Sequence, residues 1–172
     1  MNLLAIDPGS TASGWVLFDP ETSLPVMSGK TDNEELITLL RDHTGWLWQP
    51  TELYDHVVIE WSQPRGMLGS AQWFETLWWA GRFTEAARPL PVDRLDRDVI
   101  KRHLCGRTNV NDTQIRAALI DRYGGIGGKA KAVGRKNTPG PLYGIKTDAW
   151  AALAVAVTFI EQMFHEEVRD GH

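Results

Sequence analysis

The first third of the chain alternates short apolar runs with polar turns. Residues 3–6 are apolar and are closed by Asp7-Pro8-Gly9, which predicts a buried strand that ends in a turn. Similar runs predict strands at 14–18, 25–30, 56–60 and 90–95. Because short turns join the first three, we expect these three to form an antiparallel meander.

Helical patterns follow between and after these strands. The apolar spacing predicts one helix that begins after a cap at Asn33. It predicts four more over residues 70–87, 97–104, 111–123 and 147–165. The segment 124–144 is rich in Gly, Lys and Arg, and we interpret it as a flexible basic loop. We therefore expect one α/β domain over residues 1–172, a five-stranded mixed sheet flanked by helices.

Three acidic residues occupy unusual places in this pattern. Asp7 ends the first strand, Glu60 ends the fourth, and Asp148 opens the last helix. Acids at the ends of apolar strands are costly to bury unless they are paired or bind a cation. If the first and fourth strands are neighbours, Asp7 and Glu60 lie side by side, and Asp148 approaches from a helix packed on the sheet.

Carboxylate oxygens suit Mg²⁺ or Mn²⁺, and two such ions can activate a water and stabilise the leaving oxygen of a phosphodiester. Each acid also has a simpler interpretation. Asp7 can cap its turn, Glu60 can leave the sheet into solvent, and Asp148 can be a first-turn acid favoured by the helix dipole. The combination of all three favours a metal site.

Charge is unevenly distributed along the chain. The net charge is −4, but residues 97–136 hold ten Lys and Arg against three acids. Such asymmetry can attract a polyanion to one face, although solvated helix faces are the simpler alternative. The candidates for phosphate contacts are Arg107, Lys129, Lys131, Arg135 and Lys136, whose contacts would be sensitive to salt and carry little sequence information.

Other features exclude several classes of protein. A single cysteine, Cys105, leaves no disulfide framework or thiolate zinc site within one chain. No leader is visible, and the longest apolar stretch, 149–160, is too short to span a bilayer. We therefore expect a cytoplasmic protein with no membrane partner and no small-molecule cofactor.

The chain contains eight tryptophans. Several aromatic residues share one face of the helix predicted at 70–87, together with a leucine and a glycine: Trp73, Phe74, Leu77, Trp78 and Gly81. This face is either a dimer interface or ordinary core packed on the sheet, and base stacking on the rings is less favoured.

The acidic motifs resemble a known family. Residues 4–15, Leu-Ala-Ile-Asp-Pro-Gly-Ser-Thr-Ala-Ser-Gly-Trp, resemble the opening strand and hairpin of RuvC-type Holliday junction resolvases. Residues 57–60 are similar to the second acidic strand of that family, and 148–151 to the start of its last helix. The order and spacing agree along all 172 residues, and 139–144 resemble phage-borne members.

This resemblance implies a ribonuclease H-like fold and a homodimer. It also implies two Mg²⁺ ions per site, replaceable by Mn²⁺, and paired nicks across a four-way DNA junction. By position, Asp7, Glu60 and Asp148 would be the metal ligands and Lys101 would lie near the scissile strand. Trp61 and Met67 are candidates for the apolar wedge that props the junction open. The cuts would leave 5′-phosphate and 3′-hydroxyl ends.

One position departs from the family. Three residues before the last acid, the family usually has Asp or His, whereas this chain has Ile145 followed by Lys146. A ligand is therefore missing or is supplied from elsewhere, and Lys146 is a candidate to neutralise the scissile phosphate instead.

Three alternatives to a branched-DNA endonuclease remain open. An RNA-directed nuclease would share the same fold, and Ile145 also suits a binding protein that has lost catalysis. Residues 7–11 resemble the phosphate loop of sugar-kinase-like and actin-like ATPases, but those need two domains and this chain has room for one.

Overall fold

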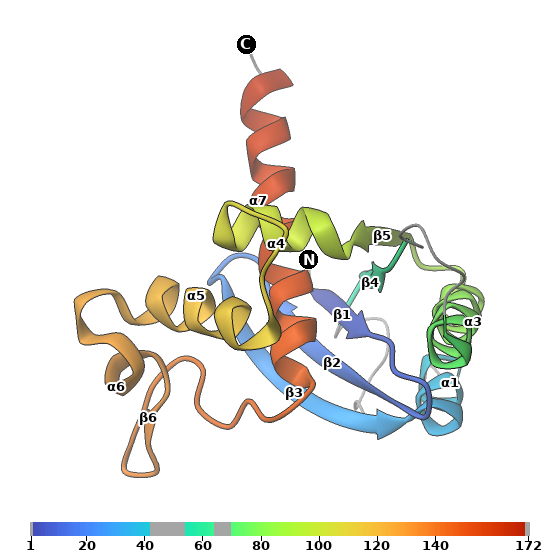
Figure 1. Ribbon diagram of the computed structural model, residues 1–172, viewed down its shortest axis with the longest axis horizontal. Helices are drawn as coiled ribbons and strands as arrows, with labels where there is room; N and C mark the ends of the chain where they lie inside the picture. The colour runs from blue at the N-terminus through green and yellow to red at the C-terminus, as the bar shows by residue number, and fades with distance from the viewer. Residues whose placement is uncertain (1, 42–53, 64–69, 171–172) are drawn as a thin grey trace.

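The computed structural model describes residues 2–41, 54–63 and 70–170 and is built on a mixed five-stranded sheet with strand order β3-β2-β1-β4-β5 (Figure 1). The strands are β1 (Leu3–Asp7), β2 (Ala12–Asp19), β3 (Leu24–Asp32), β4 (His56–Trp61) and β5 (Val92–Asp96). The first three form an antiparallel meander, and β4 pairs in parallel with both β1 and β5. The predicted sheet is confirmed.

Helices cover both faces of this sheet. The main ones are α1 (Asn33–Arg41), α3 (Ala71–Ala86), α4 (Arg97–Cys105), α5 (Asp112–Gly124) and α7 (Ala149–Asp170). One face carries α7 together with α4 and α5, while α1 and α3 pack on the other (Figure 1). None of the helices in the described ranges has the length and apolar character needed to cross a bilayer.

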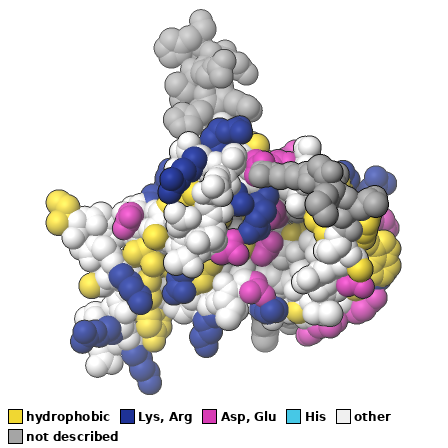
Figure 2. Space-filling model, in the orientation of Figure 1, with side chains coloured by type: hydrophobic (Ala, Val, Ile, Leu, Met, Phe, Trp, Pro, Cys, Tyr) yellow, Lys and Arg dark blue, Asp and Glu magenta, His cyan; other side chains and the backbone are white. Residues whose placement is uncertain are grey.

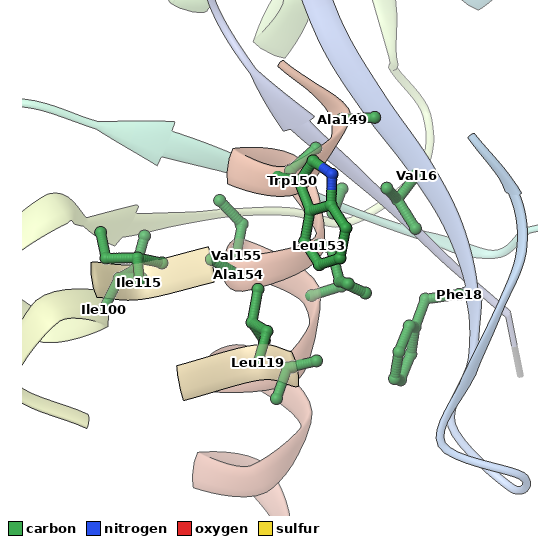
Figure 3. Close-up of a cluster of buried hydrophobic side chains, with 14 of the residues drawn as sticks. Val16, Phe18, Ile100, Ile115, Leu119, Ala149, Trp150, Leu153, Ala154 and Val155 are labelled. Carbon is green, nitrogen blue, oxygen red and sulfur yellow. The ribbon is translucent and has the colours of Figure 1, made fainter. Parts of the chain in front are cut away.

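Successive residues of the strands feed these two layers in turn, because side chains alternate across a sheet. In β1, Leu3 and Ala5 join the cluster under α7, whereas Leu4 and Ile6 join the cluster under α1 and α3. Val16 and Phe18 of β2 face Leu153 of α7 in the first cluster (Figure 3). Burial on both faces explains why β1 is apolar without alternation.

The N-terminus of α1 differs from the expectation that Asn33 caps it. The Asp32 carboxylate accepts hydrogen bonds from the backbone N–H groups of Glu34 (2.9 Å) and Glu35 (3.4 Å), so Asp32 is the capping side chain. Asn33 is fully buried and contacts the turn after β1 instead. Asp and Asn cap helices equally well, so tertiary contacts decided between these neighbours.

The segment 124–144, expected to be a flexible loop, has regular structure. It contains a 3₁₀ turn (Gly125–Gly127), α6 (Gly128–Ala132) and a short hairpin of β6 (Gly134–Arg135) and β7 (Thr138–Pro139). Ala132 and Leu142 are fully buried in the core cluster under α7, and the Leu142 N–H donates to the Ala132 carbonyl (2.8 Å). These two apolar anchors hold the basic segment against the domain.

Candidate active site

The three acids predicted from the sequence line one cavity of about 400 Å³. Asp7 is the last residue of β1 and Glu60 lies near the end of β4, and the two strands run in parallel. Both side chains therefore reach the same edge of the sheet. Asp148 immediately precedes α7, whose first residues lie over that edge, and its carbonyl accepts the N–H groups of Ala151 and Ala152.

Buried polar side chains fix the turn that follows Asp7. The Asn33 side-chain amide donates to the Gly9 carbonyl (2.9 Å), and the Ser13 hydroxyl donates to Asn33 Oδ1 (2.7 Å). The Gly9 N–H in turn donates to Ser13 Oγ (3.2 Å). Ser13 and Asn33 are completely shielded from solvent, so this closed network holds the end of β1 in one geometry.

A glycine of β2 positions Asp148. A Cβ on Gly14 would lie 2.4 Å from the Asp148 carbonyl oxygen and 2.6 Å from its carbonyl carbon, so only glycine permits this approach of the two backbones. The Asp148 carboxylate forms an ion pair with Lys30 of β3. Lys30 was not predicted as a site residue, because a lysine in an exposed edge strand is common and does not indicate a partner elsewhere in the fold.

Arg97, the first residue of α4, bridges two acids at the cavity. Its Nη1 lies 2.6 Å from Glu60 Oε1, and its Nη2 lies 2.5 Å from Asp112 Oδ1. Asp112 is the first residue of α5 and also lines the cavity. Sequence analysis included both residues only in the local charge balance. The available signal was that Arg97 follows β5 directly and therefore starts at the same sheet edge as the acids.

Burial governs the electrostatics of the two central acids. The pKa of Asp7 is raised well above its usual value, first by desolvation and then by the negative charge of Glu60. Desolvation also raises the pKa of Glu60, although the neighbouring Arg97 guanidinium opposes this shift. Burial and the neighbouring acid therefore both disfavour the ionised form of Asp7.

The donor set fits a hard divalent cation, because four carboxylates line the cavity, those of Asp7, Glu60, Asp112 and Asp148. As the side chains stand, however, no three His, Cys, Asp or Glu residues in the described ranges are gathered closely enough to hold a metal ion. Arg97 binds Glu60, and Lys30 binds Asp148. A cation bound between these acids would compete with both basic side chains.

Ile145 contributes nothing to the cavity. Its side chain is buried in the core cluster under α7, and its carbonyl accepts a hydrogen bond from Trp150 Nε1 (3.1 Å). Ile145 therefore offers no ligand atom to the cavity. A fourth carboxylate reaches the cavity from Asp112 instead, and its role was not anticipated.

The predicted basic residues fall into two groups. Lys146 lines a hollow of about 280 Å³ next to the main cavity, together with Lys30 and Thr147. Lys101 is half-buried in α4, and its charge lowers the pKa of Glu60 against the stronger effect of burial.

The second group lies outside the cavity lining and is exposed: Arg107 after α4, Lys129 and Lys131 in α6, and Arg135 and Lys136 in the hairpin. In Figure 2, acidic side chains gather near the centre of the face between basic ones, and further basic side chains cover α6 and the hairpin. The two groups present positive charge both beside the acids and at a distance from them.

Of the two wedge candidates, only Trp61 can be located. It ends β4, packs half-buried against the core cluster under α1 and α3, and carries the Arg94 guanidinium 4.6 Å from its ring centroid. Met67 lies outside the described residues. A wedge role for either residue stays a prediction.

The aromatic face of α3 is on the surface. Phe74 and Trp78 are 53% and 56% exposed, and nothing lies within 4 Å of a Cβ placed on Gly81. The core contacts of α3 come from Trp79 and Phe83. The interpretation of this face as core is therefore wrong for Phe74 and Trp78.

With this geometry established, comparison with known structures assigns the fold. The chain has the fold of RuvC-type resolvases, a ribonuclease H-like fold. It is similar to Thermus thermophilus RuvC, with a TM-score of 0.58 and 17% identity, over 95% of this chain and 96% of that one. It is also similar to T. thermophilus RuvC in complex with a Holliday junction substrate, with a TM-score of 0.60 and 16% identity, over 92% of each chain. No family model and no curated protein matches the sequence.

Proposed function

We propose that this protein is a Mg²⁺-dependent endonuclease that cuts branched DNA such as Holliday junctions. The observation that carries the proposal is the convergence of Asp7, Glu60 and Asp148 on one cavity at the sheet edge of a RuvC-type fold. A solved RuvC structure of the same fold contains a Holliday junction substrate, which supports branched DNA as the substrate class.

Asp7, Glu60 and Asp148 would hold the divalent ions, which supply an activated water and stabilise the leaving oxygen. The chain itself provides the rigid geometry. The Ser13–Asn33 network fixes the turn after Asp7, and Gly14 fixes the backbone of Asp148. Lys146 and Lys30, in the adjoining hollow, supply positive charge for the scissile phosphate.

Binding of the DNA arms would fall to the exposed basic residues. Lys101 lies beside the cavity, and Arg107, Lys129, Lys131, Arg135 and Lys136 lie farther out. Contacts of this kind fix register on the backbone without reading bases. The proposed enzyme is therefore selective for structure through the placement of its charges.

The test is to compare cleavage of a four-way junction, a linear duplex and an RNA/DNA hybrid in Mg²⁺ and in Mn²⁺. We expect cutting of the junction in preference to both others, with loss of cutting but not of binding in Asp7→Asn. The matched control is Asp55→Asn, because Asp55 is exposed and precedes β4 at the end opposite Glu60. Preference for the hybrid would replace this proposal with an RNA-directed nuclease.

A junction-binding protein without catalysis is a second candidate. It is favoured by Ile145, which faces the core, and by Arg97, which already binds Glu60. Under this alternative the junction is bound with ordinary affinity and stays intact in both metal ions.

We further propose a homodimer formed through the exposed aromatic face of α3. Phe74 and Trp78 flank an open surface at Gly81, where a second copy could approach closely. Sedimentation should show that Trp78→Glu converts a dimer to a monomer. Phe164→Glu, at an exposed aromatic residue of α7, should leave the dimer intact.

A further inference from the structure

Arg97 bridges two of the four acids that line the candidate active site. Its guanidinium spans Glu60 (2.6 Å) and Asp112 (2.5 Å), and its charge also acts on Asp7. The Glu60 side chain is 8% exposed and that of Arg97 is 32% exposed, so the ion pair is well shielded from water. Loss of such an ion pair would leave the Glu60 charge buried without a partner.

A divalent ion held by Asp7 and Glu60 would share the Glu60 carboxylate with Arg97, which already binds Oε1 of that carboxylate. Glu60 Oε1 cannot serve a guanidinium at 2.6 Å and a compact metal ion at the same point without strong repulsion between the two cations. The two cations are therefore competitors for one acid. Asp7, in contrast, forms no ion pair within the described residues, although the charge of Arg97 lowers its pKa.

Asp112 is a second, exposed partner that can keep the Arg97 guanidinium when Glu60 is released. It is 78% exposed at the mouth of the cavity and already binds Nη2. When Nη1 releases Glu60, the guanidinium can turn outward while it keeps this second contact. Arg97 therefore has a buried contact with Glu60, for which a metal ion would compete, and an exposed contact with Asp112, for which it would not.

We propose that Arg97 is a built-in competitor of the active-site cation, which must be displaced from Glu60 toward Asp112 before the ion binds. This inference deepens the proposed function and rests on the acids that the proposal assigns as ligands. The consequence can be measured without DNA as the affinity of the protein for the cation. Arg97 lowers this affinity, because Arg97 and the cation exclude each other at Glu60.

The experiment measures Mn²⁺ affinity by calorimetry, and the rise in melting temperature with Mn²⁺, for the wild type and for Arg97→Gln. We expect Arg97→Gln to bind Mn²⁺ roughly tenfold to a hundredfold more tightly, the usual range for coupling between two ligands. Its melting temperature without metal should fall, and it should rise more steeply with Mn²⁺ than that of the wild type. Arg97→Lys, which keeps a charge but cannot bridge both acids, should lie between the two.

Three matched variants make the result specific. Arg82→Gln breaks a more exposed ion pair, with Glu34, away from the cavity and should leave Mn²⁺ affinity unchanged. Asp7→Asn should remove the binding in the wild-type and Arg97→Gln backgrounds alike. Asp112→Asn, added to Arg97→Gln, should change affinity by less than about threefold, because the proposal makes Asp112 a partner of the arginine and not of the metal.

Equal Mn²⁺ affinity in the wild type and Arg97→Gln would overturn the proposal, and so would weaker binding in Arg97→Gln. A tenfold loss on adding Asp112→Asn to Arg97→Gln would also overturn it, because Asp112 would then bind the metal without the arginine being involved. The outcome is separable from the nuclease assignment. Tighter binding in Arg97→Gln together with intact junctions would refute cleavage and leave the competition standing.

Discussion

The contact between Gly14 and the start of α7 makes Gly14→Ala a sharp test of how the site is held. A Cβ at this position would lie 2.4 Å from the Asp148 carbonyl oxygen, whereas ordinary contacts begin at 3.4 Å. The two backbones must therefore separate by about 1 Å, and neither partner is a flexible side chain that could move aside. Overpacking of this kind costs about 1–3 kcal/mol.

For a domain of this size, that cost lowers the melting temperature by roughly 3–9 °C. Cleavage of a junction, measured well below the melting temperature, should fall by more than the folded fraction does, because Asp148 moves with its backbone. Gly81→Ala is the control for the stability measurement alone, because Gly81 lies in the proposed dimer face. Nothing lies within 4 Å of its Cβ, so it should stabilise α3 by about 0.5–1 kcal/mol. Wild-type stability and full cleavage in Gly14→Ala would refute this account of how Asp148 is positioned.

Three further outcomes follow from the site. Because the pKa of Asp7 is raised in the fold, ionisation of this carboxyl destabilises the metal-free protein as the pH rises above about 4. The free energy of unfolding of Asp7→Asn should therefore increase relative to that of the wild type with rising pH. A difference between the two proteins that stays constant from about pH 4 to 8 contradicts this. Asn33→Ala should cost about 1–3 kcal/mol in chemical denaturation, because it leaves Gly9 and Ser13 without their buried partner, whereas exposed Asn137→Ala should cost almost nothing. Replacing Lys129, Lys131, Arg135 and Lys136 with Gln should weaken junction binding and flatten its salt dependence; an unchanged salt slope would remove these residues from the DNA interface.

Much of the site was predictable because it lies where local patterns change. The apolar run of β1 stops at Asp7, that of β4 stops at Glu60, and the apolar helix α7 starts after Asp148. An acid at such a boundary is visible in the sequence because its neighbours are of the opposite character. The pairing of β1 with β4 then follows from their shared burial on both faces.

The basic partners of these acids were not predictable in the same way. Arg97 reaches Glu60 across 37 positions, and Lys30 reaches Asp148 from an edge strand. Each partnership depends on where one element ends relative to another, which no periodicity encodes. Asp32 and Asn33 make the same point at one helix start, because either could cap α1 and only the buried contacts of Asn33 decide.

The position of Asp148 has a consequence for biosynthesis. The third acid enters the cavity only when α7, from the last part of the chain, packs on strands made from the first part. A ribosome that has released β1 to β5 has produced a sheet edge with Asp7 and Glu60 but without their third partner. The third acid therefore joins the other two only after α7 has been synthesised, and a chain that stops before α7 lacks the complete set of acids.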